Sequence, residues 1–186
     1  MTAGILILAA GQSRRFGSDK RNALLPCGQP LLARSVERAL ASGLPVIVCL
    51  RVDDQALAQT LQSAGASTLF CPEADLGMGA TLAYAITRIS GWDSVLIALG
   101  DMPNIKPATF CKAATAIHPG QICQPTYKGT SGHPVGFSKH YFAEIARLGG
   151  DSGARKLIEK HEQALVCLPV DDPGILSDID TPADLQ

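Results

Sequence analysis

The chain contains a continuous apolar run, Ile5-Leu6-Ile7-Leu8-Ala9-Ala10, followed by Gly11-Gln12-Ser13-Arg14-Arg15-Phe16-Gly17-Ser18-Asp19-Lys20. An apolar run without alternation is typical of a strand that is buried on both faces of a parallel sheet. The glycines and cations after it predict a phosphate-binding loop. Gly11 would let the backbone approach a ligand, and Arg14, Arg15 and Lys20 would neutralise phosphate oxygens. The alternative is an ordinary strand-to-helix turn with solvated cations.

This loop differs from two better-known phosphate loops. The P-loop needs Gly-x4-Gly-Lys-Ser/Thr, whereas here five residues separate Gly11 from Gly17 and Arg21 follows Lys20. The dinucleotide fingerprint needs a third glycine, which is missing. We therefore expect a phosphate site of another type.

Composition limits the classes of protein to which the chain can belong. A length of 186 residues with 46% hydrophobic content suits a single domain, residues 1–186, with a sizeable core. The net charge of −1 gives no electrostatic footprint for nucleic acid, so we expect no nucleic-acid partner. The first apolar run is too short for a signal peptide or a membrane span, and no C-x-x-C pair occurs. We expect a cytoplasmic protein with reduced thiols and no membrane partner.

Apolar runs alternate with helical patterns along the rest of the chain. Strands are predicted at residues 45–50, 67–70, 94–99, 122–125, 133–137 and 163–170, and helices at residues 31–42, 53–64, 79–89, 107–117, from about 155, and from 181. This alternation predicts right-handed βαβ units, and hence an α/β fold with a mostly parallel central sheet. Pro134 suits either an edge strand or the start of a strand.

Two segments carry candidate ligand groups. Asp101 follows the run at residues 94–99, and ligands bind at the carboxyl ends of strands in open α/β sheets. One carboxylate together with substrate phosphates is a usual way to hold Mg²⁺. Gly77 and Gly79 lie at a helix start, where a ligand can approach free N–H groups. The alternatives are turn chemistry for Asp101 and a loop that merely needs flexible residues for the glycines.

Two later segments could contact an anionic substrate. Residues 148–155 place small residues and Arg155 at a helix start, which makes a good anion site. His133 could contact an acceptor phosphate, although a lone histidine at the start of a strand is more often structural or exposed.

Together these motifs resemble the nucleotidyltransferases that attach a nucleotide to molybdopterin, and most closely the molybdenum cofactor cytidylyltransferase branch. The matching blocks are Leu8-Ala9-Ala10-Gly11-x-Ser13-x-Arg15-Phe16-Gly17, Leu24-Leu25-Pro26, Gly77-Met78, Gly100-Asp101-Met102-Pro103, Gly132-His133-Pro134-Val135, Gly150-Asp151-x-Gly153-Ala154-Arg155 and Asp178-Ile179-Asp180-Thr181-Pro182. The resemblance implies a three-layer, Rossmann-like nucleotide-diphospho-sugar transferase fold. It also implies an NTP, Mg²⁺ and a phosphorylated acceptor of the molybdopterin type.

The same resemblance implies roles for individual residues. The residues that it implies for nucleotide binding are Leu8, Ala9, Ala10, Gly11, Arg15, Lys20, Gly77, Met78 and Gly79. Those that it implies for catalysis are Arg15, Lys20 and Asp101. Acceptor binding falls to His133, Pro134, Asp151, Gly153 and Arg155. The metal ligands are Asp101 and Asp178, with Asp180 as a less favoured substitute. Residues 21–23 separate Lys20 from the Leu-Leu-Pro block, where the family usually has one residue, so Lys20 and Arg21 share or exchange the triphosphate role.

The implied reaction is transfer of CMP from CTP to the terminal phosphate of molybdopterin, with release of pyrophosphate. Ala9-Ala10 matches the cytidylyltransferase branch, whereas the guanylyltransferase branch usually has two glycines there. The alternatives are another NTP or another phosphorylated acceptor, or a non-enzymatic carrier of nucleotide or of the finished cofactor. A client molybdoenzyme or its chaperone is the expected protein partner.

Overall fold

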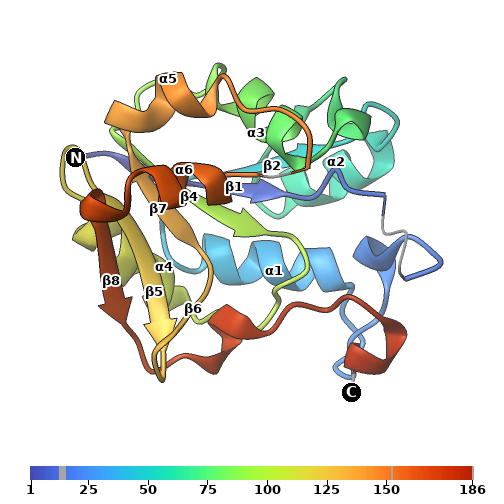
Figure 1. Cartoon of the computed structure of the whole chain (residues 1–186). Coiled ribbons are helices and arrows are strands. Elements are labelled where there is room, and N and C mark those ends of the chain that lie inside the picture. Colours follow the sequence, from blue (N-terminus) through green and yellow to red (C-terminus); the bar gives the residue numbers. More distant parts are fainter. Residues whose placement is uncertain (13–15, 152, 186) are drawn as a thin grey trace.

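The computed structural model describes residues 1–12, 16–151 and 153–185, which form one mixed sheet between two layers of helices (Figure 1). The strands are β1 (Ala3–Leu8), β2 (Val46–Leu50), β3 (Ser67–Phe70), β4 (Ser94–Leu99), β5 (Ile122–Tyr127), β6 (Thr130–Ser131), β7 (Val135–Ser138) and β8 (Leu165–Pro169). The helices are α1 (Leu31–Leu40), α2 (Gln55–Ser63), α3 (Met78–Ile86), α4 (Pro107–Ala116), α5 (Phe142–Ile145) and α6 (Arg155–Lys160).

The sheet has the order β3-β2-β1-β4-β7-β5-β6, and β8 pairs with β5. Strands β3, β2, β1 and β4 are mutually parallel, as are β5 and β8, which confirms the predicted α/β fold with a mostly parallel sheet. Strand β7 runs antiparallel between β4 and β5. Pro134 therefore does not belong to an edge strand. It comes directly before the first residue of β7, as in the other predicted possibility.

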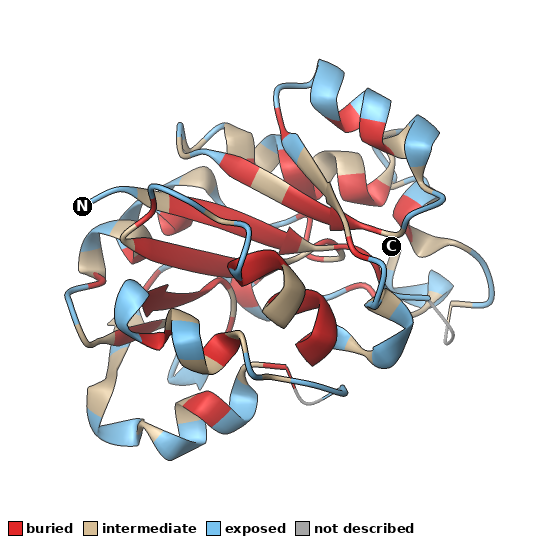
Figure 2. Cartoon of the chain, turned by 90° about the horizontal axis from the view of Figure 1, so that it is seen from above, coloured by how far each residue is buried: buried red, intermediate tan, exposed pale blue. Residues whose placement is uncertain are grey.

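The core lies on both faces of the sheet, which explains the unbroken apolar run of β1. Ile5 and Ile7 pack into the cluster formed with α1, α2 and α4. Leu6 packs into the cluster formed with α3, α5 and α6. Because successive side chains of a strand point to opposite faces, a strand covered on both sides must be apolar at every position. Figure 2 shows this central part of the sheet as buried.

Some element boundaries differ from those predicted. Helix α2 begins at Gln55 and its N-cap residue is Asp54, not Asp53. The Asp54 side chain makes no capping hydrogen bond, because its carboxylate accepts hydrogen bonds from Arg21 and Arg51 instead. The expected last helix is a short 3₁₀ turn, Pro182–Leu185. None of the described helices is long and apolar enough to cross a membrane.

The segment after β8 returns to the carboxyl ends of the central strands. The Ile179 N–H donates to the Asp101 carbonyl at 3.0 Å, and the His133 N–H donates to the Ile175 carbonyl at 3.0 Å. Figure 1 shows this red segment running back to the blue loop that follows β1. The fold thus brings residues near both ends of the sequence to one edge of the sheet.

Candidate active site

A cavity of about 460 Å³ opens at the carboxyl ends of β1 and β4, the edge at which open α/β sheets bind ligands. Several separate segments contribute to it. The described residues that line it are Leu8, Ala9, Ala10, Gly11, Gln12, Lys20, Arg21, Leu31, Ala74, Asp75, Leu76, Gly77, Met78, Thr81, Leu99, Gly100, Asp101, Asp151 and Asp180. The volume is suitable for a nucleotide-sized ligand.

Lys20 reaches into this cavity from a 3₁₀ turn, Lys20–Asn22. Its Nζ lies 2.6 Å from Asp101 Oδ2 and 3.3 Å from Asp180 Oδ1, and it donates to the Ile179 carbonyl at 3.0 Å. Burial lowers the pKa of Lys20, but hydrogen bonds and the charges of Asp101 and Asp180 more than offset this. The net pKa lies above its ordinary value, so the ammonium form is held at neutral pH.

Asp101 binds Lys20 through only one of its two carboxylate oxygens, Oδ2. Its Oδ1 is buried and has no hydrogen-bond partner among the described residues. Buried polar atoms nearly always have partners, so such an oxygen indicates a ligand position. An unpaired carboxylate oxygen fits a hard divalent cation such as Mg²⁺. The described side chains contain no cluster of three or more His, Cys, Asp or Glu residues that could hold a metal by themselves, and one or two carboxylates with substrate phosphates are sufficient for Mg²⁺.

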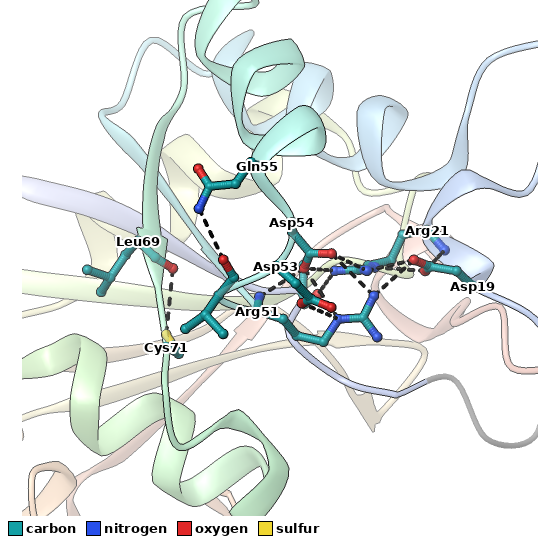
Figure 3. A network of polar contacts seen from close by, with 10 residues as sticks. Asp19, Arg21, Arg51, Asp53, Asp54, Gln55, Leu69 and Cys71 are labelled. Atoms are coloured by element: carbon teal, nitrogen blue, oxygen red, sulfur yellow. Dashed lines mark hydrogen bonds and ion pairs between the residues drawn. The ribbon is translucent and has the colours of Figure 1, made fainter.

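Arg21 also belongs to the cavity lining but is almost fully buried, at 4% exposed. Every N–H of its guanidinium donates to a protein oxygen: Nε and Nη2 to Asp19, Nη1 and Nη2 to Asp54, and Nη1 to the Ala9 carbonyl. Burial lowers the pKa of Arg21, but the hydrogen bonds that it donates to Asp19 and Asp54 raise the pKa above its ordinary value. Arg51 contacts the same two carboxylates (Figure 3). Of the two candidate cations, only Lys20 therefore contacts Asp101.

The opposite wall of the cavity is formed by the start of α3 and the loop before α6. Gly77 has φ = +112°, and a Cβ there would lie 2.6 Å from the Gly150 carbonyl oxygen and closer still to Asp151 Oδ1. The Gly79 N–H donates to the Gly150 carbonyl at 2.7 Å. Gln12 Nε2 donates to Asp75 Oδ1 across the mouth of the cavity. The glycines at this helix start thus allow two backbone segments to approach each other closely.

The structure brings many, but not all, of the predicted site residues to the cavity. Those that line it are Leu8, Ala9, Ala10, Gly11, Lys20, Gly77, Met78, Asp101 and Asp151. Those that do not are Gly79, His133, Pro134, Gly153, Arg155 and Asp178. Arg15 lies outside the described residues.

The reasons why these residues lie outside the cavity lining differ. Gly153 packs against Met78, and Arg155 is exposed and pairs with Glu159 at 3.0 Å. The His133 ring is turned toward β4, with Nδ1 3.5 Å from the Ile97 carbonyl. Burial lowers the pKa of His133, although the charges of Asp101 and Asp178 oppose this.

The positions of the two candidate acids near the end of the chain also differ. Asp178 is exposed, whereas Asp180 lines the cavity and contacts Lys20. The negative charge of Asp178 acts on the pKa of His133, whereas Asp180 contacts Lys20 directly.

Sequence reasoning missed the paired charges of Asp19, Arg51 and Asp54. The available signal was their position, since Arg51 and Asp54 come directly after the buried strand β2. Charged residues at the carboxyl end of a central parallel strand point toward a ligand site.

The sheet order and the cavity at its carboxyl edge define the class of fold, the nucleotide-diphospho-sugar transferase fold. Rv0371c from Mycobacterium tuberculosis H37Rv shares it, with a TM-score of 0.85 and 27% identity over 99% of this chain and 95% of that chain. A structure of the same mycobacterial protein in complex with manganese has a TM-score of 0.80.

The chain belongs to the MobA-like NTP transferase domain family, whose model matches residues 5–165. Purine catabolism protein PucB of Bacillus subtilis (strain 168) is 30% identical over 95% of this chain and 91% of its own length. Nicotine blue oxidoreductase of Paenarthrobacter nicotinovorans is 24% identical over 95% of this chain and 91% of its own length.

Proposed function

We propose that this chain is a nucleotidyltransferase that transfers CMP from CTP to the terminal phosphate of molybdopterin. The observation that carries the proposal is Asp101 at the end of β4, with Oδ2 on Lys20 and a buried, unpartnered Oδ1. A carboxylate and an ammonium in one cavity are the charges that a metal–triphosphate complex requires. Membership of an NTP transferase family supports the same reaction class.

The roles of the chain's residues follow from these charges. The Leu8–Gly11 segment holds the base and ribose, while Lys20, together with Arg15, binds the triphosphate. For that role the Lys20 ammonium leaves the carboxylates and moves to the phosphates. The acceptor phosphate is already ionised at neutral pH, so no protein nucleophile is needed. Catalysis is then positioning and electrostatic stabilisation of the departing pyrophosphate.

Asp101 and a second aspartate hold the divalent cation. When bound, Mg²⁺ neutralises charge on the phosphate oxygens. The manganese complex of Rv0371c supports a divalent metal in a relative. The second acid was predicted to be Asp178, but the contact of Asp180 with Lys20 and its position in the cavity wall favour Asp180.

The identities of the base and of the acceptor rest on the sequence. Ala9-Ala10 is the version of the loop that resembles cytidylyltransferases. His133, Pro134, Gly153 and Arg155 stay predictions for the acceptor side, and Asp151 is the member of that set which lines the cavity. We also propose that the protein acts in the cytoplasm and that its protein partner is a client molybdoenzyme or the chaperone of that enzyme.

The deciding experiment measures pyrophosphate release by the purified chain with molybdenum-loaded molybdopterin and each of the four NTPs, with Mg²⁺ and with EDTA. We expect release with CTP and Mg²⁺ only. Release with a different NTP would overturn the choice of base but keep the reaction. Release with CTP and a different phosphorylated acceptor would overturn the choice of molybdopterin.

Two added measurements, CTP binding and the absorbance of a nicotinamide cofactor, separate two other classes of function. Metal-independent binding of CTP without pyrophosphate release would favour the carrier. The name of the nicotine blue relative suggests an oxidoreductase, which would instead change the absorbance of an added nicotinamide cofactor. The paired charges of Lys20 and Asp101 favour the transferase over both.

A further inference from the structure

We propose that Arg21 is a positioning residue that fixes the Ala9–Ala10 peptide in the wall of the nucleotide site. Arg21 does so by holding the Ala9 carbonyl while it is itself anchored on Asp19 and Asp54. The inference rests on the proposed nucleotide site, and assigns to Arg21 a different role from the triphosphate contact that the sequence suggested.

Two hydrogen bonds fix the backbone of Ala9. The Ala9 N–H donates to the Cys49 carbonyl at 3.1 Å, and the Ala9 carbonyl accepts from Arg21 Nη1 at 3.1 Å. A peptide group is planar and trans, so fixing its carbonyl also fixes the direction of the N–H of the next residue, Ala10. Both alanines line the cavity, where they are 6% and 3% exposed. The orientation of this wall therefore depends on Arg21.

Arg21 is itself held by two carboxylates that come from different segments of the chain. Asp54 lies in the turn between β2 and α2, and it also accepts from the Arg51 N–H at 2.9 Å. Asp19 lies in the loop after β1 and also contacts Arg51 Nη2, at 3.1 Å. Figure 3 shows both carboxylates facing the guanidinium. Arg21 thus connects the loop after β1, the end of β2 and the end of β1, and its planar fork suits two bidentate carboxylate pairs.

The hydrogen-bond donors of Arg21 also disfavour a contact with the triphosphate. All of its guanidinium N–H groups are used within the protein, so contacting a triphosphate would break bonds that hold a buried charge. The Asp54 carboxylate accepts from Arg21 and makes no capping hydrogen bond to α2, although Asp54 is the N-cap residue. A residue that acts only through the wall at Ala9–Ala10 affects every nucleotide alike. A residue that binds phosphates affects the triphosphate most.

The experiment compares binding of CTP and CMP by isothermal titration to the wild-type chain and to Arg21→Lys. Lysine keeps the charge but has three donors on one nitrogen in place of the five that Arg21 uses, so it cannot form both bidentate carboxylate pairs and also hold the Ala9 carbonyl. We expect affinity for CTP and for CMP to fall by the same factor, about tenfold or more, as for loss of charge-assisted hydrogen bonds. In steady-state assays KM for CTP should rise by that factor, while kcat changes little, which is the signature of lost uniform binding.

Two further variants make the test specific. Asp54→Asn removes the anchor but leaves Arg21 in place, and asparagine is a good N-cap residue, so the helix should persist. It should reproduce the equal loss even if Arg21→Lys fails to fold. Arg51→Lys is the matched control, because Arg51 contacts the same carboxylates without reaching Ala9. It should change both affinities by no more than about twofold.

The amide signals of Ala9, Ala10 and Gly11 give a readout without any ligand. In ¹H–¹⁵N spectra of the free chain they should shift in Arg21→Lys and Asp54→Asn, and stay in place in Arg51→Lys. A selective loss of CTP binding, with CMP binding and the three amides unchanged, would overturn the inference while leaving the proposed function intact. A wild-type chain that binds none of the four NTPs would overturn both.

Discussion

Lys20 Nζ lies 2.6 Å from Asp101 Oδ2, while Oδ1 of the same carboxylate is buried without a partner among the described residues. One oxygen of this carboxylate thus contacts an ammonium group of the chain, and the other oxygen is suited to bind a divalent metal ion. Both groups come from loops at the carboxyl ends of neighbouring parallel strands, β1 and β4. This arrangement supports a site that exchanges its internal ion pair for a metal–phosphate complex.

Asp101→Asn should lower turnover by about 10²-fold or more, because it removes a main electrostatic element of the site without changing its shape. Steady-state pyrophosphate release measures the effect, and circular dichroism checks that the variant is folded. A folded variant with nearly normal turnover would contradict the metal role of Asp101.

Asp180→Asn should reduce activity more than Asp178→Asn, by about tenfold or more, because Asp180 lines the cavity and contacts Lys20 whereas Asp178 is exposed. Turnover measured over a series of Mg²⁺ concentrations distinguishes a weakened metal site from a simple loss of stability. If Asp178→Asn proves the more damaging of the two, the second metal ligand is Asp178, as the sequence predicted.

Gly77→Ala should destabilise the fold by about 3 kcal/mol, because it adds an unfavourable φ and a clash with the Gly150 backbone. Gly91→Ala is the control, since Gly91 also has a positive φ, +78°, but a Cβ there would meet nothing within 4 Å. It should cost only about 1 kcal/mol. Urea denaturation of both variants gives the comparison, and equal losses would mean that close packing at Gly77 contributes nothing.

Acid should weaken the fold partly through Glu144. Hydrogen bonds from Lys160 and His161 lower the pKa of Glu144 to about 2. A depressed carboxylate pKa stabilises the folded state fully above the unfolded pKa, near 4.3, and this contribution is lost as pH falls toward about 2. The melting temperature of Glu144→Gln should lie below that of the wild-type chain at pH 6.

The difference between these two melting temperatures should shrink as the pH falls from about 4 to about 2, and should be smaller in 1 M salt, because Glu144 is near the surface. Thermal melts of both proteins across this pH range provide the measurement. A difference that stays constant with pH would rule out the titration of Glu144 as its source.

Much of this fold is visible in local sequence patterns. The apolar run of β1 predicted a strand buried on both faces, and the position of Asp101 after another such run predicted its place at the carboxyl edge of the sheet, where the cavity opens. These inferences succeed because side-chain alternation and strand direction are properties of neighbouring residues. The MobA-like family assignment likewise follows from short motifs that keep their order along the chain.

Other features depended on contacts between distant segments. Nothing local distinguishes Lys20 from Arg21, yet one faces Asp101 and the other is buried between Asp19 and Asp54. The choice arises because Asp54, at the end of β2, is brought beside the loop after β1 only when the sheet is assembled. The same holds for Asp180, which reaches Lys20 through the returning terminal segment, and for β7, which pairs inside the sheet. Buried charges take the partners that the packed fold supplies, and sequence spacing does not encode those partners.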